Sequence, residues 1–533
     1  MTVRTIESIL KAEGPCLSNR VCQALEADGL AAATARQRIA RAGGAVHKLS
    51  GLPFPKGVRF MYLDSHRGGR AYWQALVRDA KLASPAYSAA LAALLARGGI
   101  VPERHFPIVC GSPIGQTGQV SAGAVLERLL AADLVHRTEA VGLGSCISLK
   151  DNLFLTAQED AALGARLRTE VILLSAVRDW ARKLGVASYD AIQTRDSAEG
   201  LPRVGTFNWD LAGPSYLRPM VRRDGDGRPI PGFLAADVVV GSTLDEAAVA
   251  AFVRKCTIVG GLRKVAPIFP VLVADAFSRE AFRLGRSHGV MMATPELLFG
   301  REVAEGLAAL MHTLTKAAAL AVEKPEVVDK IFRSLERIEG AAGNLRGDLF
   351  EMLVGHCVAK LDDGSIDIGR KIIDPTTGRG AEIDVFRVKE YREVWSYECK
   401  GRSPTQVTTL DDVETWLTTK VPRIHNWAVR QDRFQECSFH YEFWTCGTFA
   451  PDALQRLAAA KAEIGRYAIG WKDGPDVRKY AARLRPKSVL NMLDQHFFNH
   501  PLARIDRQYD APSNSKALGV ETEDGNLLEV GVP

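Results

Sequence analysis

The chain has 533 residues, of which 47% are hydrophobic and 24% charged, a balance typical of globular proteins with sizeable cores. At roughly 100–200 residues per domain, this length predicts three or four domains and excludes a small single-domain module. The formal net charge of +6 is compatible with a polyanionic partner but does not by itself indicate one.

The cysteines and the N-terminus bear on the compartment. Nine cysteines occur without a C-x-x-C pair or zinc-ligand spacing, which favours reduced, buried thiols. The first residues contain acids and no long apolar run, so no signal peptide is expected. No apolar segment approaches the roughly 18 residues needed to cross a bilayer. We therefore expect a cytoplasmic protein without a membrane partner.

Residues 1–66 are expected to form a small helical domain that ends in a β-hairpin. Helical periodicity covers residues 5–12, 18–26 and 31–42, and two short strands follow. This order resembles a winged helix-turn-helix. The third helix carries residue types that reach phosphates and base edges in DNA, namely Arg36, Gln37, Arg38 and Arg41. The alternative is a protein–protein module in which these arginines are only solvated.

Residues 67–155 are expected to repeat this plan after a linker. Residues 85–97 and 121–132 are expected helices, and the second is less basic than its counterpart in the first unit. We therefore expect it to pack or position more than it reads DNA. The basic linker at 64–81 carries Tyr72 and Trp73, and it either tracks a phosphate backbone or forms a solvated connector helix.

Three further regions complete the domain prediction. Residues 160–300 are expected to form an α/β domain with a long helix and strands at 205–213, 216–222 and 232–241. Residues 301–342 are an expected helical connector. Residues 476–533 are expected to hold a basic helix and an acidic tail.

The most informative stretch lies within residues 343–475. It predicts a helix with Glu351, a hairpin with Asp384, and a strand that ends in Glu-Cys-Lys at 398–400. Side chains alternate along a strand, so Glu398 and Lys400 share one face while the Cys399 side chain points into the core. Two carboxylates and an ammonium at one sheet edge form a place for a hard divalent cation beside a water molecule.

This pattern resembles the PD-(D/E)xK (restriction-endonuclease-like) nuclease superfamily over residues 343–473. One departure is that Asp384 follows Glu382-Ile383, so the proline that names the superfamily is missing. The order of elements after the motif is also similar. The resemblance implies a multidomain chain in which α+β winged helices precede two α/β restriction-endonuclease-like domains, each with a mixed central sheet flanked by helices.

The end of the 160–300 region resembles Mrr-type members of the same superfamily. Asp210 stands where the metal-binding Asp is expected, but the next strand offers Ala and Asp in place of Glu-x-Lys. We therefore interpret this region as a degenerate nuclease domain kept for DNA contact, pairing or dimerisation. The alternative is an unrelated α/β domain.

The resemblance also implies site residues and a cofactor. Mg²⁺ (or Mn²⁺) would be held by Asp384, Glu398 and the backbone carbonyl of Cys399, with Lys400 orienting or deprotonating the attacking water. Glu351 would support the metal, with Asp348 as the competitor for that role and Glu382 as a possible second-metal acid. The alternative for each is an ordinary ion pair, such as Glu398 with Lys400.

These residues predict a Mg²⁺-dependent DNA endonuclease, with bacterial restriction or anti-phage defence as the context that the family implies. A homodimer is expected because one catalytic domain cuts one strand. The alternatives are a non-catalytic DNA-binding or assembly protein, and the nuclease subunit of a larger ATPase-driven or RNA-cleaving complex. The chain has no phosphate-binding loop of its own, so an ATPase would be a partner in such a complex.

Overall fold

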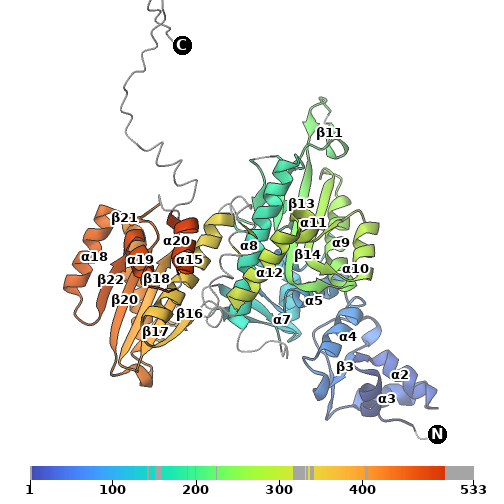
Figure 1. The fold of residues 1–533 in the computed structure, drawn as a ribbon. Helices are drawn as coiled ribbons and strands as arrows, with labels where there is room; N and C mark the ends of the chain where they lie inside the picture. The colour runs from blue at the N-terminus through green and yellow to red at the C-terminus, as the bar shows by residue number, and fades with distance from the viewer. Residues whose placement is uncertain are drawn as a thin grey trace, which may run out of the picture.

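The computed structural model describes residues 3–140, 143–150, 159–188, 190–197, 200–223, 225–315, 331, 334–335, 341–402, 406–485 and 487–498. It is a multidomain α/β architecture in which two mixed sheets are flanked by helices and preceded by smaller α+β units (Figure 1). Within the described residues, no helix combines the length and apolar character needed to cross a membrane.

The first unit has the order helix, strand, helix, helix, strand, strand. Its elements are α1 (Ile6–Glu13), β1 (Cys16–Leu17), α2 (Ser18–Ala27), α3 (Ala32–Arg41), β2 (Val46–Lys48) and β3 (Phe60–Leu63). They form an antiparallel sheet in the order β1-β3-β2. The three helices and the two later strands match the sequence prediction. Strand β1 was missed because two residues carry no readable periodicity.

The second unit has the same order of elements and the same sheet order. It consists of α5 (Pro85–Ala96), β4 (Ile100–Pro102), α6 (Phe106–Val109), α7 (Ala122–Ala131), β5 (Val135–Ala140) and β6 (Gly144–Leu149). The sheet runs β4-β6-β5. The predicted repetition of the plan is therefore present in the topology.

Helix α4 (Arg70–Ala80) joins these two units, and it corrects the interpretation of the linker as a solvated connector. Tyr72 and Trp73 are only 4% and 2% exposed, and they pack in one hydrophobic core with residues of both units. The helix is neither a solvated connector nor a support that offers its aromatic rings to a phosphate backbone.

The middle unit is built on a five-stranded sheet in the order β15-β14-β13-β10-β7. Its main elements are α8 (Glu159–Lys183), β7 (Gln193–Thr194), β10 (Leu211–Ser215), β13 (Gly232–Leu244), α9 (Glu246–Gly260), β14 (Ile268–Phe277), α10 (Arg279–Ser287) and β15 (Met291–Ala293). Strands β7, β10 and β13 are antiparallel neighbours, and β13, β14 and β15 are parallel.

Two features of the middle unit differ from the sequence prediction. The expected strand at 216–222 is mainly a 3₁₀ turn, η4 (Arg218–Met220), because Pro219 has no N–H to donate to a sheet. The expected connector begins with α12 (Arg301–Thr315), which follows α11 (Pro295–Phe299) and packs on α8 as part of the middle unit. Most of 316–340 lies outside the described residues.

The C-terminal unit repeats the middle unit's layout with the order β16-β17-β18-β20-β22. Its elements are α15 (Ala341–Leu361), β16 (Ser365–Ile373), β17 (Gly380–Lys389), β18 (Glu393–Lys400), α16 (Leu410–Thr415), α17 (Val421–Ala428), β20 (Ser438–Thr445), α18 (Pro451–Glu463), β22 (Ala468–Lys472), α19 (Gly474–Ala481) and α20 (Ser488–Leu493). A π-helical turn (Trp416–Lys420) separates α16 from α17. The expected tail at 499–533 lies outside the described residues.

The two large units share a hydrophobic core. Helices α8 and α15, each the first helix of its unit, contact one another, and one buried cluster contains residues of both sheets and both helices. Burial of this continuous apolar surface stabilises the pair of units as one body. Helix α8 therefore lies between the middle sheet and the C-terminal unit (Figure 1).

Candidate functional site

Asp384 and Glu398 face each other across the centre of the C-terminal sheet. Val385 of β17 pairs with Tyr397 of antiparallel β18, so the next pair along is Asp384 with Glu398. The backbone N–H of Cys399 donates a 2.7 Å hydrogen bond to Oδ2 of Asp384. Both carboxylates are buried, at 6% and 4% exposure. The strand register therefore brings two acids together where both are almost fully shielded from solvent.

Two lysines converge on the Glu398 carboxylate. Nζ of Lys400 lies 2.8 Å from Oε1, as the shared strand face predicts. Nζ of Lys420, in the π-helical turn, lies 2.6 Å from Oε1 and 2.7 Å from Oε2. The two lysine side chains are 31% and 30% exposed, so they form a partly solvated rim above the buried acid.

Both ammonium groups keep their protons in this environment. Burial alone would lower the pKa of Lys400, but the adjoining Glu398 carboxylate more than offsets it and raises that pKa. The pKa of Lys420 is raised by the same balance, with Asp384 also contributing. Lys400 is therefore suited to stabilise negative charge rather than to act as a general base.

The buried acids behind this rim lack comparable compensation. Burial raises the pKa of Asp384 to about 7, and repulsion from Glu398 adds to the effect. Burial also raises the pKa of Glu351 on α15 well above its ordinary value, with Asp384 and Asp348 as further causes. No hydrogen bond or ion pair joins Glu351 to another residue in the described part of the chain. An added cation would favour the ionised form of these acids.

Asp348 and Glu382 are tied to a residue from the middle unit. Arg168 of α8 lies 3.1 Å (Nη1) from Oδ1 of Asp348 and 3.2 Å (Nη2) from Oε1 of Glu382. Burial raises the pKa of Asp348 to about 6 although Arg168 opposes the shift. Asp348, the predicted competitor of Glu351, and Glu382, the predicted second-metal acid, thus both contact the Arg168 guanidinium. They lie at the edge of the acidic cluster, which consists of Asp348, Glu351, Glu382, Asp384 and Glu398.

A magnesium site is compatible with this donor set, although the side chains are not arranged around one. Among the described residues, no group of three or more His, Cys, Asp and Glu side chains has the arrangement of a metal site. Asp384, Glu398 and Glu351 nevertheless supply only carboxylate oxygens, which Mg²⁺ prefers, and burial raises the pKa of Asp384 and Glu351 despite the nearby cations. These residues would hold the ion, with Glu398 shared between it and the lysines.

Cys399 and two histidines of the C-terminal unit have structural contacts. The Cys399 side chain is buried, as predicted. His425 packs against Phe439, Tyr441 and Tyr467, and His440 stacks on Trp395 with 4.0 Å between ring centroids. Both histidines are therefore held as structural residues.

The middle sheet has a second centre at the same register. Leu211 of β10 pairs with Ala236 of β13, so Asp210 lies opposite Asp237. The backbone N–H of Val238 donates a 2.9 Å hydrogen bond to Oδ2 of Asp210, as Cys399 does to Asp384. Lys255 of helix α9 lies 2.7 Å from Oδ2 of Asp237, as Lys420 contacts Glu398. The prediction that Asp210 takes the position of Asp384 matches this register.

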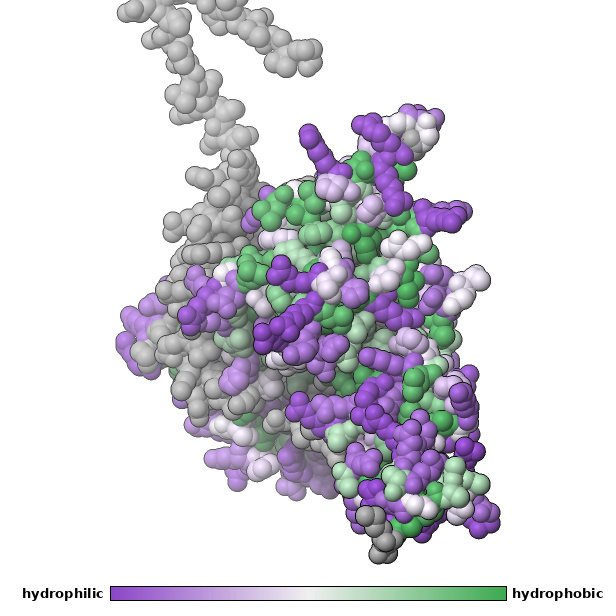
Figure 2. All heavy atoms as spheres, turned by 90° about the vertical axis from the view of Figure 1, so that its right-hand side faces the viewer, coloured by the Kyte–Doolittle hydropathy of each residue, from purple (hydrophilic) through white to green (hydrophobic). Residues whose placement is uncertain are grey.

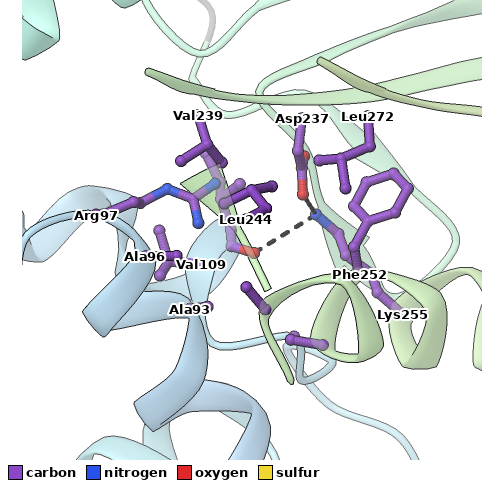
Figure 3. A pocket seen from close by; sticks show the side chains of 14 residues that line it. Ala93, Ala96, Arg97, Val109, Asp237, Val239, Leu244, Phe252, Lys255 and Leu272 are labelled. Atoms are coloured by element: carbon purple, nitrogen blue, oxygen red, sulfur yellow. Dashed lines mark hydrogen bonds and ion pairs between the residues drawn. The ribbon is translucent and has the colours of Figure 1, made fainter. Parts of the chain in front are cut away.

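This middle centre is filled by its own cations and covered by the second unit. Nη1 of Arg195 lies 2.8 Å from Oδ1 of Asp210, and its Nη2 lies 2.5 Å from Oε2 of Glu170. Arg97, at the end of α5, and Lys255 surround a cavity of about 20 Å³, far too small for a nucleotide (Figure 3). Burial alone would raise the pKa of Asp210, but Arg195 and Arg97 outweigh it and lower that pKa.

One difference between the two centres lies on the edge strand next to each aspartate. Thr194 pairs with Leu211, so the next residue, Arg195, lies opposite Asp210. In the C-terminal unit, Ile368 and Arg370 pair with Val385 and Ile383, so Gly369 lies opposite Asp384. Gly369 has a φ of 67°, a backbone conformation that favours glycine. The space that a guanidinium occupies in the middle unit is therefore left without a side chain in the C-terminal unit.

The predicted DNA-contacting residues lie elsewhere. Helix α3 exposes all four of them: Arg36, Gln37, Arg38 and Arg41. This helix and strand β18 stand at opposite ends of the view in Figure 1. The α3 surface is therefore separate from the cluster around Asp384.

Comparisons with protein families, with curated proteins and with solved structures found no match to this chain.

Proposed function

We propose that the chain is a Mg²⁺-dependent DNA endonuclease whose hydrolytic centre lies in the C-terminal unit. The observation that carries the proposal is the convergence of two lysines on Glu398 beside Asp384, on two adjacent central strands of the sheet. Bound magnesium would polarise the scissile phosphate and make a nearby water a better nucleophile. Restriction or anti-phage defence is the context that the family resemblance implies.

The protein's own residues would divide the remaining work. The Cys399 N–H fixes Asp384, and Lys420 fixes both oxygens of Glu398, so the two acids are held before any cation arrives. Lys400 stays protonated on the partly exposed rim, where its charge would stabilise the extra negative charge on the phosphate in the transition state.

Delivery to DNA is assigned to the α+β units, which we interpret as winged helices. Their shared order of elements and the exposed basic face of α3 support this role. Replacing Arg36, Arg38 and Arg41 together with alanine should reduce the salt slope of duplex binding by about 2–3, since each lost phosphate contact removes about 0.9. Arg279, Arg283 and Arg286, exposed on α10, form the matched control triple.

A second basic surface supports a polyanionic partner. The connection between β10 and β13 forms a hairpin of β11 (Arg222–Arg223) and β12 (Pro229–Ile230), which projects from the middle unit (Figure 1). Hydrophilic side chains project at this end of the molecule in Figure 2. Its exposed arginines are Arg218, Arg222, Arg223 and Arg228.

Cleavage assays separate the proposal from its alternatives. Purified protein would be incubated with plasmid, linear DNA and RNA, each with Mg²⁺ or with EDTA. Mg²⁺-dependent DNA cleavage that is lost in both Asp384→Ala and Lys400→Ala supports the proposal, and cleavage that survives both substitutions rejects it. Salt-dependent binding without cleavage would favour a non-catalytic DNA-binding protein, which the filled coordination of Glu398 by two ammonium groups also permits.

Double-strand cleavage would require two chains. The middle centre holds arginine where the C-terminal centre is open, so each chain offers one candidate centre within the described residues. A homodimer is therefore proposed for double-strand breaks, and a monomer is expected to nick one strand.

A further inference from the structure

Helix α8 has contacts with three units of the chain. On one face, Nη2 of Arg166 donates a 2.7 Å hydrogen bond to the carbonyl of Ile100 in β4, and Glu170 binds Arg195 of the middle centre. Arg168 is two residues from Arg166, which is about 200° around a helix, so it points to the opposite side. There it meets Asp348 of α15 and Glu382 of β17.

The two faces of α8 differ in how exposed their charged side chains are. Arg166 and Glu170 are 9% and 1% exposed in their side chains, fully enclosed between the second and middle units. The Arg168 side chain is 36% exposed, and its two acidic partners are 14% and 25% exposed. Arg168 therefore stands at the open edge of the acidic cluster, where a charged ligand could still reach it.

Arg168 contacts acids other than the Glu398 carboxylate that the lysine rim binds. Lys400 and Lys420 bind Glu398, on strand β18. Arg168 binds acids on α15 and β17 instead, the two elements that also carry Glu351 and Asp384. The cluster is thus held from two sides, by lysines of its own unit and by an arginine of the middle unit.

We infer that the candidate site is completed by the middle unit, with Arg168 as a positioning residue. It holds Asp348 and Glu382 in place and reduces the negative charge that an approaching DNA phosphate meets. This inference rests on the proposed function, because it assigns Arg168 a part in cation and phosphate binding at the same centre. It also gives the degenerate middle unit a role in the reaction, through α8.

Loss of the Arg168 charge should have opposite effects on cation binding and on phosphate binding. A positive charge close to a cation site weakens binding of the cation and strengthens binding of a phosphate. Arg168→Gln in the full chain should therefore bind Ca²⁺ at least about threefold more tightly, after allowing for screening by salt. The same variant should raise the KM for duplex DNA by at least about threefold, with a smaller change in kcat. Arg168→Lys, which keeps the charge, should return both values toward wild type.

The experiment combines Ca²⁺ titration calorimetry with Mg²⁺-dependent cleavage kinetics. Arg182→Gln is the matched control, because Arg182 lies on the same helix and pairs with Asp179 away from the acidic cluster. Unchanged or weaker Ca²⁺ binding in Arg168→Gln would overturn the inference. Weaker binding together with a lower melting temperature would show that Arg168 only fastens α8 to α15. Absence of Ca²⁺ binding and cleavage in the wild type would instead reject the proposed function itself.

Discussion

The C-terminal and middle units present the same two-acid centre in opposite electrostatic states. In both sheets, a buried aspartate accepts a hydrogen bond from a backbone N–H of the neighbouring strand: Asp384 from Cys399, and Asp210 from Val238. Each aspartate faces a second acid, Glu398 or Asp237, that binds a lysine from a helical segment. The pKa of Asp384 is raised to about 7, mainly by burial, whereas Arg195 and Arg97 lower the pKa of Asp210. Arginines of the middle and second units thus outweigh the effect of burial on Asp210, whereas burial prevails at Asp384.

This difference separates a structural ion-pair network from the centre that we propose binds a cation. Buried charges are stable when paired and costly when left alone. The middle unit meets that requirement with Arg195, where the C-terminal unit has Gly369. It also has Val239 two residues after Asp237, where the C-terminal unit has Lys400 after Glu398. Under the proposed function, a few positions therefore decide which of the two similar sheets binds a cation.

The largest effect is expected from breaking the middle network. Asp210→Asn leaves Arg195 and Arg97 without their shared carboxylate, and loss of one member of such a buried network costs about 3–5 kcal/mol. Thermal denaturation should show a clearly lowered transition. Asp384→Asn in EDTA at pH 8 is the comparison variant and should not be destabilised. Equal losses in both variants would remove the distinction between the centres.

Removal of the rim charge should affect rate rather than stability. Lys400→Ala is expected to slow Mg²⁺-dependent DNA cleavage by about 10² to 10³, as for other groups that stabilise transition-state charge. Lys389→Ala, at the far end of strand β17, is the matched control. Initial rates under saturating substrate give the measurement. A similar rate for both variants would mean that Lys400 has no part in the chemistry.

An arginine at position 369, equivalent to Arg195 of the middle unit, should weaken cation binding at the C-terminal centre. A Cβ at Gly369 would lie 3.7 Å from Oε1 of Glu382, so Gly369→Arg would place a guanidinium among the acids. Divalent-cation affinity should fall at least about tenfold, which corresponds to roughly 1.4 kcal/mol. Gly378→Arg carries a comparable backbone penalty, with a φ of 68°, but has nothing within 4 Å of its Cβ. Equal cation affinity in the two variants would contradict the comparison.

The smallest effect concerns pH. The folded pKa of Asp384 is raised to about 7 from its ordinary value near 3.8, so the folded state binds the extra proton between these values. The contribution of this group to stability is therefore present at low pH and declines as pH rises from about 4 through 7. In EDTA, Asp384→Asn should gain on the order of 1 kcal/mol relative to wild type between pH 5 and 8. A constant difference would mean that Asp384 titrates normally.

Most elements of the C-terminal unit were predictable because they are long and periodic. The alternation in β17 and β18 was sufficient to put Glu398 and Lys400 on one face, and the structure has them 2.8 Å apart. The helix–strand–helix–strand order after Lys400 also matches the prediction.

Three features of the candidate site depend on tertiary geometry, which no local sequence pattern predicts. Lys420 reaches Glu398 through a π-helical turn, and such a turn changes which residues share a helix face. Arg168 meets Asp348 only because α8 packs on α15, more than 150 residues along the chain. The role of Gly369 depends on Asp384, which lies opposite it, and only the strand register shows this pairing.

The most direct test of the central claim is the stoichiometry of Mn²⁺ binding to the full chain, measured by titration calorimetry near pH 8. We expect one Mn²⁺ site per chain in the wild type and loss of that site in Asp384→Asn. The middle centre should bind no Mn²⁺. Undiminished Mn²⁺ binding in Asp384→Asn would contradict the central claim, because the ion would then be held somewhere other than the C-terminal acids.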